Sequence, residues 1–197
     1  MYTLDNDSKG GSRRMVFLDR DGTINQDSPD YIKSPAEFSF LPGAFAAMRR
    51  LAGLGIDVIV VTNQGVIGRQ MVEEEVIDEI NRQMVEEIEC EGGNIAGVYL
   101  CPHAPWMGCA CRKPEPGMLS QASQDYGIDL SRSFMVGDKE SDVEAGKAAG
   151  CLPILLSPDC GPSAMGGHRP DGAIVASNLY QATQRIENVL TCETVLY

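Results

Sequence analysis

Short apolar segments alternate with amphipathic segments along most of the chain. The apolar segments are rich in β-branched side chains, which is typical of buried strands. Strands are predicted at residues 15–18, 56–61, 98–100, 134–136, 152–156 and 173–175. Between them, apolar residues recur at spacings of three and four, which predicts helices over residues 42–54, 72–91, 118–126, 142–149 and 178–190.

This alternation of strands and helices indicates an α/β protein with a doubly wound, mostly parallel sheet covered on both faces. Rossmann-like sheets of this kind bind ligands beyond the carboxyl ends of their strands. The residues that directly follow each strand are therefore the first candidates for a functional site.

The length of 197 residues suits one domain with a sizeable core. Residues 1–14 are polar and contain two adjacent glycines, so we expect a flexible tail there and a single domain over residues 15–197. The tail lacks the apolar stretch of a secretion signal, and no apolar run approaches the roughly 20 residues of a membrane helix. A cytoplasmic protein is expected.

The formal net charge of −12 bears on the partners of the chain. A strongly acidic surface repels nucleic acid and anionic membranes. It would also repel a phosphate ester, so any phosphate site must be locally cationic. We therefore expect a small-molecule partner, neither nucleic acid nor membrane, and a monomer.

Four polar motifs follow predicted strands or precede predicted helices. Each motif alone has an ordinary interpretation as a turn, a helix cap or a solvated charge. Their order along the chain and their positions are informative together. They are Asp19-Arg-Asp21-Gly22-Thr23, Thr62-Asn63-Gln64, Arg112-Lys113-Pro114 and Gly137-Asp138-Lys139-Glu-Ser-Asp142.

Phosphoryl transfer accounts for this set of residue types. A carboxylate nucleophile such as Asp19 splits ester hydrolysis into two easier steps through an aspartyl-phosphate. Two anions must then approach each other, which calls for Mg²⁺ on the carboxylates of Asp19 and Asp138. Asp21 can protonate the leaving oxygen and then activate water. Thr62 and Lys113 can donate to the phosphate oxygens, where transition-state charge is spread.

With these motifs the chain resembles the haloacid-dehalogenase-like (HAD-like) phosphatases, from about residue 15 to about residue 180. The resemblance implies that Asp19 is the nucleophile and Asp21 the general acid and base. It also implies Mg²⁺ held by Asp19, the Asp21 carbonyl and Asp138. Asp142 would then mainly support the metal ligands rather than bind the metal directly.

A cysteine-rich loop precedes the third motif and has the spacing Cys101-x-His103-x5-Cys109-x-Cys111. Three thiolates and one imidazole match a closed tetrahedral zinc site, which is structural because no ligand position stays open. Reduced surface cysteines or a disulfide within the loop are the alternatives. The loop leads directly into Arg112 and Lys113, so zinc would fix the backbone that presents them. The remaining cysteines are predicted to be buried or incidental thiols: Cys90, Cys151, Cys160 and Cys192. His168 is predicted to be a surface histidine.

The zinc loop narrows the resemblance to a subgroup with the D-glycero-D-manno-heptose 1,7-bisphosphate phosphatases and the histidinol-phosphate phosphatases. Several stretches resemble the heptose enzymes: residues 17–25, 61–64, 111–118 and 135–139. Two features depart from the heptose pattern. The five-residue gap in the zinc motif is similar to the histidinol-phosphate type, and Gln64-Gly-Val-Ile-Gly-Arg69 differs from the usual Ser-Gly-Ile-Ala form.

The resemblance also implies contacts with the substrate. Asp27, Ser28 and Asp30 would contact sugar hydroxyls, and Lys139 would lie beside the metal site. Arg112 would recognise a second phosphate. The phosphate that is removed would be held by Thr62, Asn63 and Gln64. No cap domain fits between the motifs, so specificity is expected from the loops at residues 26–39 and 65–70 and from the zinc loop.

Three functions remain open at this point. The first is hydrolysis of the 7-phosphate of the heptose bisphosphate. The second is hydrolysis of histidinol phosphate, whose amine would need a carboxylate from Asp27, Asp30 or Glu37. The third is a catalytically silent binding module stabilised by zinc, which would be expected to lack Asp19 or Asp21, whereas both are present. A capless site would also admit a larger ester, such as a phosphopeptide.

Overall fold

The computed structural model describes residues 13–158, 169 and 171–194. Six strands of the described chain form one parallel sheet in the order β3–β2–β1–β4–β5–β6. The predicted α/β class with a parallel sheet is confirmed. The strands are β1 (Met15–Leu18), β2 (Asp57–Asn63), β3 (Ile95–Cys101), β4 (Phe134–Gly137), β5 (Leu152–Leu156) and β6 (Ile174–Ala176).

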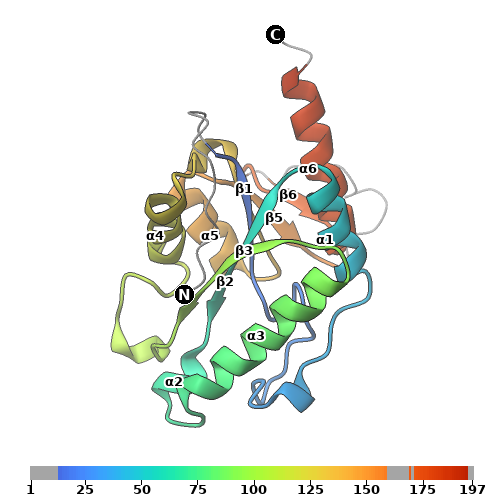
Figure 1. Cartoon of the computed structure of the whole chain (residues 1–197). Coiled ribbons are helices and arrows are strands. Elements are labelled where there is room, and N and C mark those ends of the chain that lie inside the picture. Colours follow the sequence, from blue (N-terminus) through green and yellow to red (C-terminus); the bar gives the residue numbers. More distant parts are fainter. Residues whose placement is uncertain (1–12, 159–168, 170, 195–197) are drawn as a thin grey trace.

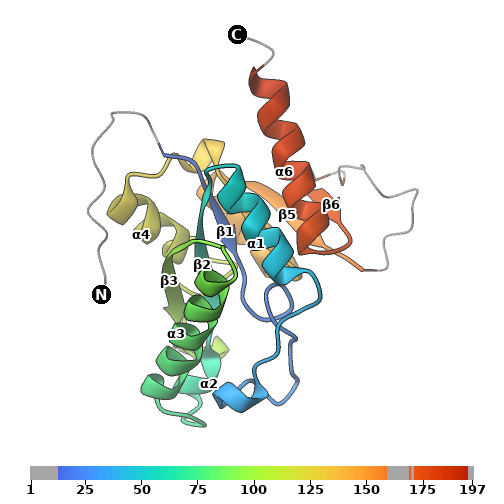
Figure 2. The ribbon, with the colours of Figure 1, turned by 45° about the vertical axis from the view of Figure 1, so that its right-hand side comes forward.

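Helices cover both faces of this sheet, as Figure 1 shows. Helices α1 (Ala44–Gly53), α3 (Glu74–Cys90) and α6 (Leu179–Thr194) pack on one face, and α4 (Gly117–Tyr126) and α5 (Glu140–Ala149) pack on the other. Figure 2 shows α1 lying beside α6. Shorter turns of helix are α2 (Gly65–Gly68), η1 (Pro35–Glu37), η2 (Pro105–Met107) and η3 (Leu130–Arg132).

The side chains of the central strands alternate between two hydrophobic cores. In β1, Val16 and Leu18 join the core under α1, α3 and α6, whereas Met15 and Phe17 join the core under α4 and α5. All four side chains are fully buried. Successive residues of a strand point to opposite faces, so a strand buried on both faces reads as one continuous apolar run. This explains why β1 is evident in the sequence.

β2 and β3 extend beyond their predicted bounds, and one predicted loop is partly helical. β2 extends to Asn63, so Thr62 and Asn63 lie within the strand rather than after it. β3 begins at Ile95 rather than at residue 98. The loop predicted at residues 65–70 contains helix α2, whose glycines approach the backbone of residues 102–104 closely. The two glycines of α2 gave the segment the composition of a loop.

The described chain contacts the domain before the predicted boundary at residue 15. Arg13 forms a bridge with Ile128, and its carbonyl accepts a 2.8 Å hydrogen bond from the backbone N–H of Asp129. The side chain of Arg13 also pairs with Asp57. The flexible tail over residues 1–14 stays a prediction, and residues 1–12 of it lie outside the described residues. Cys160 and His168 lie outside them as well.

The segments between the four polar motifs are short in the part of the chain that the structure describes. Only η1 and α1 separate β1 from β2, and α2, α3, β3 and η2 separate β2 from Lys113. These elements either belong to the layers around the sheet or form short turns. In the described ranges, no helix has the length and apolar character needed to cross a membrane.

Candidate active site

Asp19 lies at the point where the strand order of the sheet reverses. It directly follows β1, and its backbone N–H donates a 2.9 Å hydrogen bond to the carbonyl of Val136 in β4. β1 and β4 are neighbours in the sheet, but β2 and β3 lie between them in the sequence. Ligand sites of open α/β sheets form beyond the strand ends at such a point. Asp19 is 5% exposed and therefore lies at the buried end of a candidate active site.

Lys113 connects Asp19 to the neighbouring elements. Its Nζ lies 2.7 Å from Oδ1 of Asp19 and 2.7 Å from Oδ1 of Asp142, and it donates a 2.8 Å hydrogen bond to the carbonyl of Val61. Burial lowers the pKa of Lys113, but the two carboxylates outweigh it and raise the pKa above its ordinary value. Lys113 is therefore a buried, fully charged ammonium ion beside Asp19.

Three carboxylates gather around this point and form a candidate metal site. Ligand atoms of Asp19, Asp138 and Asp142 all lie within 4.8 Å of one another. Oδ1 of Asp138 is buried, and no described residue donates a hydrogen bond to it. Burial raises the pKa of Asp138, and burial together with nearby Asp142 raises that of Asp19 to about 7 against the opposing effect of Lys113. An all-oxygen site with an unpartnered carboxylate oxygen fits a hard divalent cation such as Mg²⁺.

Two glycines permit this close approach of carboxylates. Gly22 has a φ of +87°, and a Cβ built on it would lie 2.2 Å from Oδ2 of Asp138. A Cβ on Gly137 would lie 2.2 Å from Oδ2 of Asp142. A side chain at either position would occupy the space of a carboxylate, so both glycines are required by the site rather than by the turns alone.

Asp21 is held by hydrogen bonds on both carboxylate oxygens. Arg20 donates to it from Nε and Nη2 at 3.1 Å, Nδ2 of Asn25 donates at 2.9 Å, and Nε2 of Gln64 donates at 2.9 Å. Arg20 is itself completely buried, and its Nη1 donates a 2.9 Å hydrogen bond to Oδ1 of Asn81 in α3. The orientation of Asp21 is thus fixed from α3 through a buried guanidinium group.

The second motif connects Asp21 and Lys113 to the end of β2. Thr62 is 1% exposed, and its Oγ1 accepts a 2.8 Å hydrogen bond from Gln64, which also bonds to Asp21. Asn63 bonds to the backbone of Lys113 twice: its Nδ2 donates to the carbonyl and its Oδ1 accepts from the N–H, both at 3.0 Å. The structure thus shows Asn63 positioning Lys113, a contact that the sequence did not indicate.

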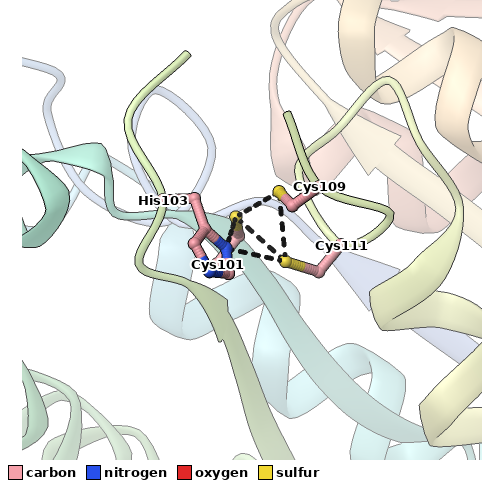
Figure 3. A group of neighbouring side chains, drawn as sticks. All are labelled: Cys101, His103, Cys109 and Cys111. Carbon is pink, nitrogen blue, oxygen red and sulfur yellow. Dashed lines mark hydrogen bonds between the residues drawn. The ribbon is translucent and has the colours of Figure 1, made fainter. Parts of the chain in front are cut away.

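The zinc loop brings four potential ligands together, and Figure 3 shows their side chains pointing toward one another. Sγ of Cys111 lies 3.2 Å from Sγ of Cys101, 3.4 Å from Sγ of Cys109 and 3.2 Å from Nδ1 of His103. Cys101 lies 3.6 Å from both Cys109 and His103. Tetrahedral zinc with Zn–S bonds of about 2.3 Å separates its ligand atoms by a little under about 4 Å. The four residues therefore fit a zinc ion with only small adjustments.

The zinc loop is also attached to the active site by its backbone. The carbonyl of Cys101 accepts a 2.8 Å hydrogen bond from the N–H of Gln64, and the carbonyl of His103 accepts a 3.1 Å bond from Nη1 of Arg112. Arg112 and Lys113 directly follow Cys111 in the chain. A change in the position of the loop would therefore move the residues around Asp19.

The loop residues that the resemblance assigned to substrate occupy an exposed rim. Oδ2 of Asp27 pairs with Nζ of Lys139 at 2.9 Å, and both side chains are about half exposed. Ser28 and Asp30 form a local turn in which Oγ of Ser28 accepts a 3.2 Å hydrogen bond from the backbone of Asp30. Asp27 and Lys139 are therefore brought to the edge of the metal site together, whereas Asp30 lies on the surface of the loop.

Sequence reasoning missed Arg20, Asn25 and Asn81 as parts of this site. Asn81 lies on the buried face of α3 among Ile77, Ile80 and Met84, where an amide must find a hydrogen-bond partner. A polar residue within an apolar helical stripe is a signal that can be read from the sequence. Its partner Arg20 cannot be read in the same way, because it lies 61 positions away.

Residues 110–182 match the HAD-hydrolase-like family model. A D-glycero-β-D-manno-heptose-1,7-bisphosphate 7-phosphatase of Pseudomonas aeruginosa is 40% identical over 168 residues, which cover 85% of this chain and 94% of that protein. A D-glycero-α-D-manno-heptose-1,7-bisphosphate 7-phosphatase of Photorhabdus laumondii is 32% identical over 88% of this chain and 97% of that protein.

A solved structure resembles this chain over nearly its whole length. It is the D,D-heptose 1,7-bisphosphate phosphatase of Bordetella bronchiseptica in complex with magnesium and phosphate. The TM-score is 0.80 at 35% identity, and the match covers 89% of this chain and 99% of that one.

Proposed function

We propose a substrate and a mechanism for this chain, which belongs to the HAD-like family of D-glycero-D-manno-heptose 1,7-bisphosphate 7-phosphatases. The chain hydrolyses the 7-phosphate of D-glycero-D-manno-heptose 1,7-bisphosphate in a Mg²⁺-dependent reaction. The observation that carries this proposal is the buried carboxylate of Asp19, which lies against Lys113 and within reach of Asp138 at the strand-order reversal. The names of the relatives supply the substrate.

In the first chemical step, a carboxylate oxygen of Asp19 attacks the phosphorus of the 7-phosphate. A new bond forms between that oxygen and phosphorus, and the bond from phosphorus to the sugar oxygen breaks. Asp21 gives its proton to the departing sugar oxygen. Asp21 is oriented for this transfer by Arg20 and Gln64, which hold its carboxylate.

In the second step, water attacks the phosphorus of the aspartyl-phosphate. Asp21, now ionised, takes a proton from that water, and the bond between phosphorus and Asp19 breaks. Inorganic phosphate leaves and the free carboxylate of Asp19 returns. Thr62 and Lys113 donate to the equatorial oxygens of the phosphoryl group in both steps, where negative charge is spread in the transition state.

Mg²⁺ would be held by the carboxylates of Asp19 and Asp138 and by the carbonyl of Asp21. When bound, this cation supplies the positive charge that lets an anionic nucleophile approach an anionic ester. Asp142 keeps Lys113 in place and accepts a 3.0 Å hydrogen bond from the backbone of Lys139. These contacts support a role for Asp142 in holding the site together rather than in contacting the ester.

Zinc on Cys101, His103, Cys109 and Cys111 would have a structural role. Four protein ligands complete a tetrahedral site and leave no position for substrate. Arg112, which follows this cluster, is proposed to recognise the second phosphate. The sugar would contact the loop that carries Asp27, Ser28 and Asp30, and Lys139 would lie beside the 7-phosphate. Asn63 and Gln64 would line the phosphate site from the second motif.

The relatives favour the heptose bisphosphate over histidinol phosphate, because the proteins described above are named for the heptose substrate. The relative with 40% identity is named for the β anomer and the one with 32% identity for the α anomer. We therefore assign the β anomer to this chain. A single domain over residues 15–197 that acts as a cytoplasmic monomer, without nucleic acid or membrane partners, completes the proposal.

Steady-state kinetics with four esters tests this assignment. The esters are the heptose 1,7-bisphosphate in both anomeric forms, histidinol phosphate and a generic aryl phosphate. The highest kcat/KM is expected for the β-heptose bisphosphate, and activity should disappear when Mg²⁺ is chelated. A much higher kcat/KM for histidinol phosphate would overturn the substrate. Absence of Mg²⁺-dependent turnover with every ester would instead support the catalytically silent binding module.

A further inference from the structure

Three loops around the active site meet in a stack of one arginine and two aromatic rings. The guanidinium carbon of Arg69 lies 4.6 Å from the ring centroid of Trp106 and 5.7 Å from that of Tyr31. Tyr31 comes from the loop after β1, Arg69 follows α2, and Trp106 lies in the zinc loop. We call these three residues the arginine stack.

The charge of Arg69 has no counter-ion among the residues that the structure describes. Its Nε is buried and forms no hydrogen bond there. By contrast, Arg82 on α3 pairs with Glu79 and Glu86. Aromatic rings contact the flat face of a guanidinium group, so its N–H donors at the edge stay free to hold an anion in two parallel bonds.

The backbone around the stack is held in an unusual conformation. Tyr31 has a φ of +64° and Gln70, next to Arg69, has a φ of +57°. Side-chain-bearing residues other than asparagine and aspartate rarely adopt such left-handed conformations, and those that do cluster at ligand sites. The described chain contains no other non-glycine residue with positive φ. The local strain therefore coincides with the two loops that bring Tyr31 and Arg69 together.

The stack lies beside residues already placed in the site. Helix α2 begins after Gln64, whose side chain bonds to Asp21, and is followed directly by Arg69. A Cβ on Gly65 would lie 3.1 Å from Nη1 of Arg112, and the N–H of Gly68 donates a 2.8 Å hydrogen bond to the carbonyl of Pro102. Arg69 and Arg112 therefore border the same stretch of the zinc loop, at opposite ends of a helix of four residues.

We propose that Arg69 is a specificity-determining residue that binds the phosphate that is not cleaved, together with Arg112. The inference rests on the proposed function, because only a bisphosphate carries a second phosphate at the far end of the sugar. Trp106 and Tyr31 hold the guanidinium group between the two loops that carry them. Arg112 supplies the second positive charge that a phosphate dianion needs. Trp106 is 68% exposed, so part of its ring also remains open to the sugar.

The test compares Arg69→Gln with the matched control Arg82→Gln, in which an ion-paired surface arginine is removed. For each variant, kcat/KM is measured with the heptose bisphosphate and with an aryl phosphate in the presence of Mg²⁺ and zinc. The ratio of the two values is expected to fall on the order of 10- to 100-fold for Arg69→Gln, as for the loss of a charge-assisted bond. Arg82→Gln should keep the ratio of the unchanged protein. Arg69→Lys, which keeps the charge but not the planar donor pair, should give an intermediate ratio.

Trp106 is the single tryptophan of the chain, so its fluorescence reports directly on the stack. Titration of the Asp19→Asn holoprotein with heptose bisphosphate is expected to change the emission, and Arg69→Gln in the same background should need at least about tenfold more ligand. The inference is wrong if Arg69→Gln lowers kcat/KM by the same factor for both esters. It is also wrong if this change lowers kcat/KM for neither ester. If the unchanged protein does not prefer the bisphosphate, the proposed function fails and this inference fails with it. If Arg69→Gln does not fold, Arg69→Lys is judged by the same ratio.

Discussion

The hydrogen bond between Asn81 and Arg20 offers a direct test of how the fold supports Asp21. Asn81 is 5% exposed on the core side of α3, and its Oδ1 accepts the 2.9 Å hydrogen bond of the completely buried guanidinium group of Arg20. The change Asn81→Ala removes this acceptor. The guanidinium group then keeps its bonds to Asp21 but has a buried N–H without a partner.

The cost of this change can be worked out from the structure. A hydrogen bond to a charged group is worth about 1.5–3 kcal/mol when its buried partner is left unsatisfied. Alanine recovers about 0.5 kcal/mol or slightly more through its higher helix propensity. We therefore expect Asn81→Ala to lower the free energy of unfolding by about 2 kcal/mol, which corresponds to a fall in Tm of about 4–8 °C for a domain of this size.

Activity should fall as well, because Arg20 fixes the orientation of Asp21. General acid–base catalysis contributes about 10²- to 10⁴-fold to a rate, and a misplaced proton donor forfeits part of that factor. We expect kcat for Asn81→Ala to fall about tenfold. Asn81→Asp keeps an acceptor oxygen of the same shape and should restore most of both losses.

Denaturant unfolding and steady-state kinetics at saturating Mg²⁺ measure the two effects. The control is Asp78→Ala, an exposed position three residues earlier on the same helix, where the change should stay within about 0.5 kcal/mol. If Asn81→Ala is as stable as the unchanged protein and keeps its kcat, the guanidinium group of Arg20 does not depend on α3 and the reasoning is refuted.

Three further changes test other parts of the site. Asp19→Asn should abolish turnover without changing the circular dichroism spectrum, and no phosphorylated protein should be recovered after an acid quench. Appreciable hydrolysis by this variant would exclude Asp19 as the nucleophile. Cys109→Ser should lower the zinc content measured by atomic absorption and reduce kcat/KM through Arg112 and Lys113, whereas full activity without zinc would refute the structural role of the loop. Gly22→Ala should weaken activation by Mg²⁺, because its Cβ would lie 2.2 Å from Oδ2 of Asp138; an unchanged Mg²⁺ dependence would contradict this geometry.

The sequence predicted the sheet and the candidate nucleophile for the same physical reason. Strands buried on both faces form continuous apolar runs, and the polar residues at their carboxyl ends meet at one edge of the sheet. Asp19 and Asp138 could therefore be placed together although they come from distant parts of the chain. The cysteine loop could also be predicted from the sequence, because zinc constrains both the types of its ligand residues and their spacing.

Contacts that depend on tertiary packing could not be predicted. Lys139 pairs with Asp27 across 112 positions, and Arg20 meets Asn81 across 61, and neither spacing has a local pattern. Helix α2 was hidden by its two glycines, which permit a close approach to the zinc loop rather than a turn. The arginine stack was missed because its members lie in three separate loops, whose relative positions follow from the packing of the sheet and the zinc loop.

The ammonium group of Lys113 has three hydrogens, and Asp19, Asp142 and the carbonyl of Val61 account for all of them. A phosphate oxygen can therefore reach this group only by displacing an oxygen that is already there. Arrival of the ester is a replacement in which the number of bonds to the ammonium stays constant. The contribution of Lys113 to substrate affinity is then the difference in free energy between its bond to the phosphate oxygen and its bond to the displaced oxygen. It is not the full free energy of either bond. The same replacement runs backwards when phosphate departs, so the lysine assists the reaction without retaining the product.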